Sequence, residues 1–577
     1  MKMSRVAAFV ASVLLIPLVT AHAAEKLDRG LIAIATDTNR VYLGWRLLPD
    51  DGEDIGFNVY RVGENGSPKR LNAEPIRRST DFVDANAAPI GAGAWQLKAV
   101  VGGAEQPEVI GTISVPAKPQ PYRSIPLQRE ILFDKMSIVD LDGDGALDFV
   151  IKQPRQVTDP GVWKKSEDTF KVEAYKSDGT FLLRRDLGWN IEQGVWWSPM
   201  IACDFDGDGK AEVALKTAPM EEDFRNEAGR VLAGPEYCSI LDGMTGKELD
   251  RVDWPPRGNI EDWGDNKGNR ASRHLIGMAH LDGAGKNPSL LVMRGTYTLM
   301  LVDAYDFVNG KLKLRWRWNG DNETPKVRGQ GMHGMHAADV DGDGCDEIII
   351  GAAVIDDDGK ILWNLGMGHP DAVYVSDIDP ARPGLEIIYG FETAQETNGF
   401  CLVEAKTGKI LWGNDHKTTH IHSQGLFADI DPTNPGPEFY GGEKFLPDRW
   451  LYSARDGKLL SREDLGSLSP NPVYWDDTRF KAYIKQGKIV KHHGATLGEI
   501  EGRVVAIGDL LGDWREEIVT SMPGEIRIYT TTIPARSRRV TALADRLYRT
   551  DVALQSMGYL FPPQLSFDPY YEQARKQ

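Results

Sequence analysis

The stretch Asp140-Leu141-Asp142-Gly143-Asp144-Gly145-Ala146-Leu147-Asp148 carries carboxylates at its first, third, fifth and ninth positions and a glycine at its sixth. This is the spacing of a calcium-binding loop, in which alternate side chains turn their oxygens to one side and the glycine permits a sharp bend. The predicted metal ligands of this loop and of two further copies are Asp140, Asp142, Asp144 and Asp148; Asp204, Asp206, Asp208 and Glu212; and Asp339, Asp341, Asp343 and Glu347. No helical pattern flanks these loops as it does in an EF-hand. We therefore interpret them as structural Ca²⁺ sites between strands.

The acidic loop belongs to a longer unit that repeats along the chain. Each clean copy leads into an apolar strand pattern such as Glu347-Ile348-Ile349-Ile350, and turn signals such as Ser177-Asp178-Gly179 separate the outer strands. Weaker copies of the loop stand at Asp377/Asp379/Glu386, Asp429/Asp431/Glu438 and Asp509/Asp513/Glu517. Units of about 40 to 80 residues with this content predict an all-β fold, an eight-bladed β-propeller with seven blades as the alternative count. A β-helix competes with it, but its repeats are shorter and more regular.

The segment before the repeats divides into a leader and a small domain. Residues 1–24 have the form of a secretory signal peptide, because Lys2 and Arg5 precede an apolar run and Ala21-His22-Ala23 is a small-x-small cleavage site. Residues 25–117 contain alternating stretches such as Gly56-Phe57-Asn58-Val59-Tyr60, typical of a fibronectin-like β-sandwich. A Pro-rich linker leads to residues 122–577, the predicted calcium-binding propeller and catalytic domain. We expect a secreted or periplasmic protein.

Composition excludes one class of partner. The 577 residues have a formal net charge of -17, whereas nucleic-acid binding needs a basic face. No segment after the leader has about 18 consecutive apolar residues, so no membrane span is expected. The four cysteines form no C-x-x-C pattern and are interpreted as buried thiols, with a Cys203–Cys238 disulfide as the alternative. We expect a monomer.

Several longer motifs together resemble one family, the rhamnogalacturonan lyases of polysaccharide lyase family 11. They are Leu27-Asp28-Arg29-Gly30-Leu31, Gly229-Arg230-Val231-Leu232-Ala233-Gly234-Pro235-Glu236-Tyr237, Asp262-Trp263-Gly264-Asp265-Asn266-Lys267-Gly268-Asn269-Arg270, Gly512-Asp513-Trp514-Arg515-Glu516-Glu517 and Arg527-Ile528-Tyr529-Thr530-Thr531-Thr532-Ile533-Pro534. The resemblance implies an eight-bladed, calcium-rich propeller behind a small β domain. It also implies β-elimination at a galacturonate of a rhamnose–galacturonate backbone, so that the partner is an acidic plant or algal cell-wall polysaccharide.

The chain departs from the family pattern at three places. Gly498-Glu499-Ile500-Glu501 stands where the family has Asn-Gly-Thr-Lys, and Gln424 stands where it has an arginine. Of the family's Asn-x-x-Tyr, Ser556-Met557-Gly558-Tyr559 keeps the tyrosine. The resemblance therefore implies the reaction class, with rhamnogalacturonan or a related rhamnose–uronate polymer as substrate.

Elimination across C4–C5 of a uronate needs a cation beside the carboxylate, a base for the C5 proton and an acid for the leaving oxygen. Histidines before successive acidic strands are expected to meet at one mouth of a propeller. The candidate bases are His422 and His493, and the candidate acid is Tyr559. The candidate substrate-binding residues are His333, His336, His369, His420, Lys491 and Arg503. A catalytic metal at the histidines is left open, and the Arg515 guanidinium is expected to pair with carboxylates of its own motif.

Two other functions remain as alternatives. A glycoside hydrolase on a β-propeller needs two carboxylates flanking the scissile bond, but most acidic residues of the repeats are assigned to calcium loops. A non-catalytic, calcium-dependent glycan-binding propeller needs no titratable groups at its mouth. Scattered histidines would favour this binder, and clustered histidines would favour the enzyme.

Overall fold

The computed structural model describes residues 26–63, 65–155 and 165–570. The predicted signal peptide lies outside them. Described helices are few and short: α1 (Arg546–Leu554) and the 3-10 turns η2 (Ile260–Trp263), η3 (Gly320–Asn322) and η4 (Ala542–Ala544). None of them has the length and apolar character needed to cross a bilayer.

Most of the described chain forms eight four-stranded antiparallel sheets, and seven of them are built from four consecutive strands. The first four sheets are β10 (Lys135–Val139), β11 (Asp148–Gln153), β12 (Lys171–Tyr175) and β13 (Phe181–Asp186); β14 (Met200–Cys203), β15 (Glu212–Thr217), β16 (Tyr237–Asp242) and β17 (Glu248–Asp253); β18 (His274–Ala279), β19 (Ser289–Arg294), β20 (Leu301–Val308) and β21 (Lys311–Asn319); and β22 (Gly331–Ala338), β23 (Glu347–Gly351), β24 (Ala353–Ile355) and β25 (Ile361–Asn364).

The second four sheets complete the set. They are β26 (Pro370–Ser376), β27 (Glu386–Phe391), β28 (Phe400–Glu404) and β29 (Ile410–Gly413); β30 (Leu426–Ala428), β31 (Glu438–Gly442), β32 (Arg449–Ser453) and β33 (Leu459–Ser461); β34 (Pro472–Val473), β35 (Ala482–Lys485), β36 (Lys488–Val490) and β37 (Thr496–Glu499); and β38 (Arg503–Gly508), β39 (Glu517–Met522), β40 (Glu525–Tyr529) and β9 (Tyr122–Pro126). In the last sheet β9 pairs with β40, so an early strand completes a late sheet.

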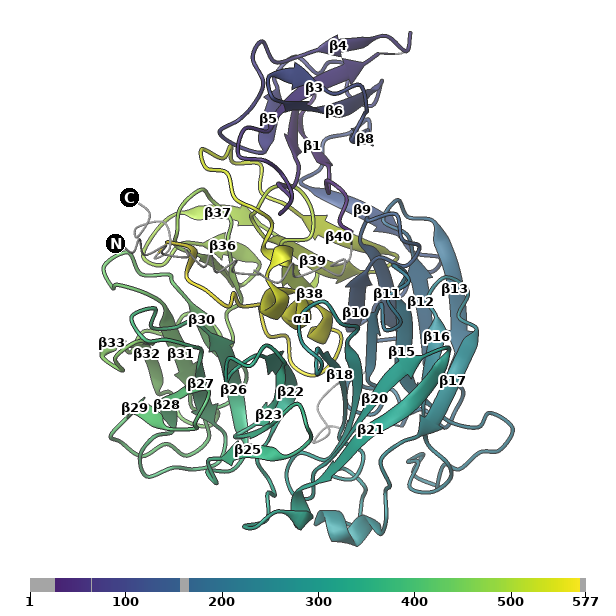
Figure 1. The fold of residues 1–577 in the computed structure, drawn as a ribbon, viewed down its shortest axis with the longest axis vertical. Coiled ribbons are helices and arrows are strands. Elements are labelled where there is room, and N and C mark those ends of the chain that lie inside the picture. Colours follow the sequence, from purple (N-terminus) through teal and green to yellow (C-terminus); the bar gives the residue numbers. More distant parts are fainter. Residues whose placement is uncertain (1–25, 64, 156–164, 571–577) are drawn as a thin grey trace, which may run out of the picture.

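The sheets stand around α1 (Figure 1). The first strands of successive sheets contact one another from β10 through β14, β18 and β22 to β26, β10 also contacts β38, and α1 packs on β10, β14, β18, β22 and β38. Inner strands are therefore covered on both faces, which explains apolar runs such as Ile348, Ile349 and Ile350, all fully buried. The outer strands β13 and β17 are half exposed. The predicted all-β fold is confirmed.

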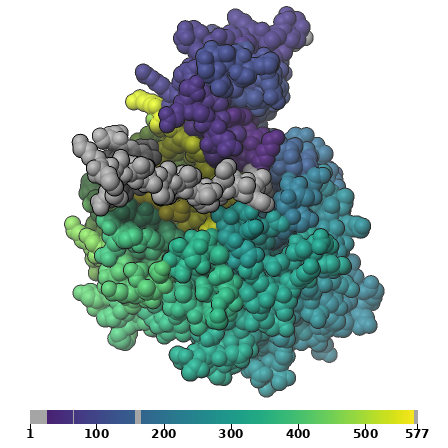
Figure 2. All heavy atoms as spheres, in the orientation of Figure 1, coloured from purple at the N-terminus to yellow at the C-terminus, as the bar shows by residue number. Residues whose placement is uncertain are grey.

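Residues before the linker form a separate lobe above the body (Figure 2). One sheet is β1 (Ile32–Asp37), β2 (Arg40–Gly44) and β5 (Asp81–Asp84); the other is β4 (Pro68–Arg70), β3 (Gly56–Val62), β6 (Ala94–Val101), β7 (Ala104–Glu105) and β8 (Gly111–Ile113). Their shared core contains Trp45, Phe57 and Trp95. The predicted N-terminal β domain is confirmed.

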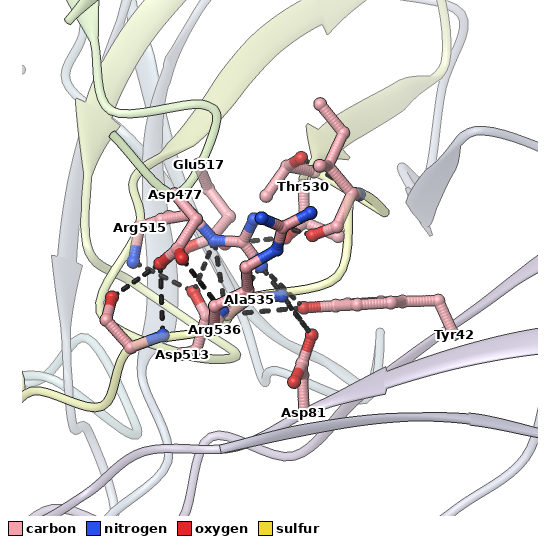
Figure 3. A network of polar contacts seen from close by, with 12 residues as sticks. Tyr42, Asp81, Asp477, Asp513, Arg515, Glu517, Thr530, Ala535 and Arg536 are labelled. Carbon is pink, nitrogen blue, oxygen red and sulfur yellow. Dashed lines mark hydrogen bonds and ion pairs between the residues drawn. The ribbon is translucent and has the colours of Figure 1, made fainter. Parts of the chain in front are cut away.

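This lobe is joined to the body by buried polar contacts (Figure 3). The Arg515 guanidinium donates to the Tyr42 hydroxyl at 2.9 Å and to the Asp513 carboxylate at 2.6 Å. The Gly512 N–H donates to the Gly30 carbonyl at 2.7 Å. Arg515 therefore pairs with a carboxylate of its own motif, as expected, and also links the two parts of the molecule. The four cysteines are free thiols.

Candidate active site

A pocket of about 240 Å³ lies where the innermost strands begin. Lys135 begins β10, Arg503 begins β38, and His333 lies on β22. The polar and aromatic side chains that line the pocket are Asp134, Lys135, Trp196, Arg273, His333, Gln424, Asn471, Arg503 and Tyr559. Convergence of strands around an axis thus gathers side chains that are far apart in the sequence.

Three of the predicted site residues line this pocket. The centre of the Tyr559 ring lies 4.7 Å from that of His333 and 5.8 Å from that of Trp196. The backbone N–H of Tyr559 donates to the backbone carbonyl of His333 at 2.7 Å. The Arg503 guanidinium lies 3.2 Å from the Asp134 carboxylate. Gln424, at a departure from the family pattern, lines the same pocket.

A cluster of histidines and carboxylates extends from His333. Asp371, which is fully buried, lies 3.2 Å from His369 Nε2, 3.5 Å from His333 Nε2 and 3.0 Å from His422 Nδ1. The Glu392 carboxylate lies 3.4 Å from His369 Nε2 and 3.7 Å from His420 Nε2. We call these six residues the histidine–carboxylate cluster. His333, His369, His420 and His422 were predicted, and the structure brings them together.

The buried members of the cluster, His333, His369 and Asp371, have shifted pKa values. Burial tends to raise the pKa of Asp371, but hydrogen bonds from His369 and His422 outweigh it and hold that pKa well below its usual value. Burial tends to lower the pKa of His369, yet the Asp371 and Glu392 carboxylates raise it to about 9. Burial, with His369 close by, keeps the pKa of His333 well below its usual value. At neutral pH His333 is therefore neutral, whereas His369 is cationic.

A cationic and aromatic wall borders His333. The Arg273 guanidinium lies 5.1 Å from the Trp196 ring centre and 4.8 Å from that of Tyr297. Arg273 Nη1 is 3.3 Å from His333 Nδ1, and the Tyr297 hydroxyl is 3.1 Å from His333 Nε2. Both ring nitrogens of His333 thus have partners. Trp196 and Trp197 are both buried, and Trp196 lines the pocket.

Three predicted residues lie elsewhere. His336 is buried, with Nδ1 2.7 Å from Asp551 on α1, because residues three apart on a strand face opposite sides. His493 and Lys491 lie in the turn between β36 and β37, the outer strands of their sheet. The His493 side chain is 66% exposed beside Glu463, and Lys491 Nζ donates to Asp476 at 2.8 Å. The structure thus places these three residues outside both the pocket and the histidine–carboxylate cluster.

Sequence reasoning missed Asp371, Glu392, Arg273 and Lys135. Asp371 had a usable signal, since His369 and Asp371 stand on either side of Pro370, the first residue of β26, and so share a face. Glu392 directly follows the end of β27. Arg273 and Lys135 are single cations at strand starts and give no spacing pattern.

Two buried lysines lie directly opposite each other on β10 and β11. Lys152 Nζ donates to the Ser198 carbonyl at 2.7 Å, and burial lowers its pKa to about 7. Lys135 Nζ donates to the Gln555 carbonyl at 3.1 Å, and burial, with Lys152 and Arg503 close by, lowers its pKa to about 7. At neutral pH these amines are therefore partly uncharged.

Replacing Lys152 with methionine is expected to stabilise the fold by about 2 kcal/mol at pH 7. The pKa of Lys152 falls from 10.5 unfolded to about 7 folded, so between these pH values the unfolded chain binds more protons. Wild-type stability therefore rises as pH rises through this window, and the advantage of the variant shrinks. Urea unfolding of wild type and variant at pH 7 and near pH 10.5 measures this difference in stability. An equal gain at both would contradict the buried-charge explanation.

The acidic loops bring three of their four predicted ligands together. Ligand oxygens of Asp140, Asp142 and Asp148, of Asp204, Asp206 and Glu212, and of Asp339, Asp341 and Glu347 lie within 4.8 Å of one another in each loop. The fifth-position residues Asp144, Asp208 and Asp343 instead accept the N–H two residues on, at 2.8 to 2.9 Å. Asp144 also pairs with Lys176 at 3.1 Å.

Comparison with known proteins places the chain in a family. A model described as "Rhamnogalacturonan lyase family 11, C-terminal domain" matches residues 130–572, and one described as "Rhamnogalacturonan I lyases beta-sheet domain" matches residues 22–113. The chain therefore belongs to rhamnogalacturonan lyase family 11.

Individual relatives span nearly the whole chain. The rhamnogalacturonan endolyase YesW of Bacillus subtilis is 38% identical over 590 residues, which cover 94% of this chain and 90% of the relative. The rhamnogalacturonan exolyase YesX of the same organism is 36% identical over 606 residues, 94% of this chain and 95% of the relative. The crystal structure of YesW matches with a TM-score of 0.85 at 37% identity, over 95% of this chain and 97% of that one.

Proposed function

We propose that the protein cleaves rhamnogalacturonan by β-elimination in the pocket at the start of the innermost strands, which we call the axial pocket. Family membership and the similarity to the endolyase YesW and the exolyase YesX support the reaction and the substrate. The observation that carries the proposal is the pocket itself, where Arg273, Arg503 and Tyr559 converge beside the histidine–carboxylate cluster. A uronate needs such cations around its carboxylate before its C5 proton becomes acidic.

The pocket argues against the two alternatives. A glycoside hydrolase needs two carboxylates across the bond, whereas Asp134 is the single acidic residue among the described side chains that line the pocket. A glycan binder needs no gathered histidines, yet four of them meet around Asp371 and Glu392.

Roles follow from the chemistry of each side chain. The Arg503 and Arg273 guanidiniums orient the uronate carboxylate. Tyr559 has a hydroxyl donor and lines the same pocket, so it is assigned as the acid that protonates the leaving oxygen. The buried Trp196 ring gives the sugar an apolar wall.

The histidine–carboxylate cluster fits a divalent cation. Its donor atoms are imidazole nitrogens and carboxylate oxygens, and those of His333, His369, Asp371 and Glu392 lie within 4.8 Å of one another. The buried His420 Nε2 atom lacks a hydrogen-bond partner, which a bound ion would supply. When bound, such an ion adds positive charge near the uronate carboxylate.

The acidic loops fit Ca²⁺. Burial raises the pKa of Glu212 to about 8 and that of Glu347 to about 8, so these carboxylates are poorly compensated by the protein alone. Oxygen ligands at this spacing are what Ca²⁺ prefers. We further propose that the eight sheets are propeller blades stiffened by these ions, and that the protein is exported by its leader.

Removing Ca²⁺ with a chelator is expected to lower the melting temperature by about 5 °C or more, since ions that bind only the folded state stabilise it. Scanning calorimetry with and without EGTA measures the shift. Added Ca²⁺ should restore the melting temperature, and Mg²⁺ should not, because it demands tighter octahedral geometry. No shift on chelation would reject structural Ca²⁺.

The activity is tested by incubating the mature protein with rhamnogalacturonan and, as controls, homogalacturonan and ulvan. Elimination creates a conjugated unsaturated uronate, so ultraviolet absorbance should rise with rhamnogalacturonan. New reducing ends without that absorbance would show hydrolysis. Neither signal would leave glycan binding as the function.

A further inference from the structure

Lys135 lines the pocket, and its amine has no part in the roles assigned above. It is the first residue of β10, is 4% exposed, and lines both the axial pocket and a small cavity behind it that Lys152 also lines. Its one described hydrogen bond runs to the Gln555 carbonyl at 3.1 Å, after the end of α1. The amine is thus held in place and still faces the space where the sugar would lie.

The surroundings of Lys135 disfavour its charged form. Across the strand pair it faces Lys152, and from β38 it faces Arg503. Asp134 is the carboxylate that opposes these cations, but the Arg503 and Arg155 guanidiniums each lie 3.2 Å from it. Neither Lys135 nor Lys152 forms an ion pair within the described part of the chain. Arg273, His333 and Tyr559 are the other titratable side chains that line the pocket.

We propose that Lys135 is the base that takes the C5 proton of the bound uronate, an assignment that rests on the proposed lyase function. The C5–H bond breaks and its proton goes to Lys135 Nζ. The electron pair forms the C4–C5 double bond as the C4–O bond breaks, and the leaving oxygen takes the Tyr559 hydroxyl proton. Transfer of the proton from the Lys135 ammonium back to Tyr559, through water, restores both groups.

Other groups of the pocket suit this role less well. Both ring nitrogens of His333 have partners, in Arg273 and Tyr297. The Arg273 and Arg503 guanidiniums are hydrogen-bond donors with no acceptor atom, so they are unsuited to take a proton. An amine with a pKa of about 7 combines a large neutral fraction with useful basicity near neutral pH.

The test compares Lys135→Arg and Lys135→Met with wild type on rhamnogalacturonan. Arginine keeps the positive charge but cannot accept a proton, so both variants should lose kcat by about 10²–10⁴-fold with little change in KM. If Lys135→Arg stays within tenfold of wild type, the amine acts only by its charge and the proposal is overturned. If wild type itself makes no unsaturated product, the proposed function fails instead.

A pH profile gives a second test that leaves Lys135 in place. Wild-type kcat/KM should rise through an apparent pKa near 7, where the Lys135 amine loses its proton. Lys152→Met removes the neighbouring cation, so this limb should move to higher pH while activity on the alkaline side is kept. A limb that does not move would overturn the assignment, even if the Lys135 variants fail to fold.

Discussion

Replacing Arg515 with methionine is expected to destabilise the protein by about 3–5 kcal/mol, because it leaves buried carboxylates without their cation. The Arg515 side chain is 1% exposed, and those of Asp513 and Asp81 are 3% and 5% exposed. Its guanidinium donates to Asp513 at 2.6 Å and to the Ile533 carbonyl at 2.6 Å, and lies 4.0 Å from Asp81.

The effect should be felt at the junction of the two domains. Tyr42 on β2 and Asp81 on β5 reach the body through this cluster (Figure 3), and the Ala535 N–H donates to Asp81 at 2.7 Å. Burial and the nearby Asp513 carboxylate raise the pKa of Tyr42, so its hydroxyl stays protonated and donates to Asp513 at 3.3 Å. Losing Arg515 therefore breaks contacts on both sides of the interface.

Urea unfolding measures the loss, and two further variants give its cause. Lys in place of Arg515 keeps the charge but not the forked geometry, so it should recover part of the stability. Adding Asp513→Asn to Arg515→Met should also recover part of it, since one uncompensated anion is removed. A loss below 1 kcal/mol in Arg515→Met, or no recovery in the double variant, would show that the cluster is not a stabilising ion pair.

The sequence predicted the repeats well and the site in part, for physical reasons. The acidic loops and the strands after them are local patterns, and both lie where the spacing predicts them. Which side chains line the pocket depends on which strand of each sheet is innermost, and no local sequence pattern reveals that. His492 and His493 are near a family motif in sequence, yet they occupy a turn between outer strands. Lys135 was missed because a lone lysine at a strand start looks like any surface cation until burial is known.

Glu501 is a second case in which the sequence alone does not locate the groups of the pocket. It ends the stretch that departs from the family pattern, and its side chain is 74% exposed and paired with Arg527 at 2.5 Å. It therefore offers the pocket no basic group. Lys135 on β10 and Arg503 on β38 supply the cations of the pocket from different strands. The lysine that this segment lacks relative to the family pattern can thus be replaced by cations from other strands, which only the fold brings together.

Replacing Asp371 with asparagine is expected to lower kcat by at least about 100-fold and to abolish binding of the divalent cation proposed for the cluster. Asp371 is fully buried and lies within 3.5 Å of His333, His369 and His422. Asparagine keeps the shape but removes the negative charge that holds these three rings and would ligate an ion. Elemental analysis of the purified protein, beside rates of unsaturated product formation, measures both effects.

Asp551→Asn is the matched control, since Asp551 is another buried carboxylate paired with a histidine, His336, at 2.7 Å. It lies on α1, outside the pocket lining, so its loss should cost stability but not turnover below the melting temperature. If both variants lose activity alike, the effect of Asp371 is on folding and not on the site. If Asp371→Asn keeps its metal and its rate, the histidine–carboxylate cluster is a structural feature, and elimination depends on the cations of the pocket alone.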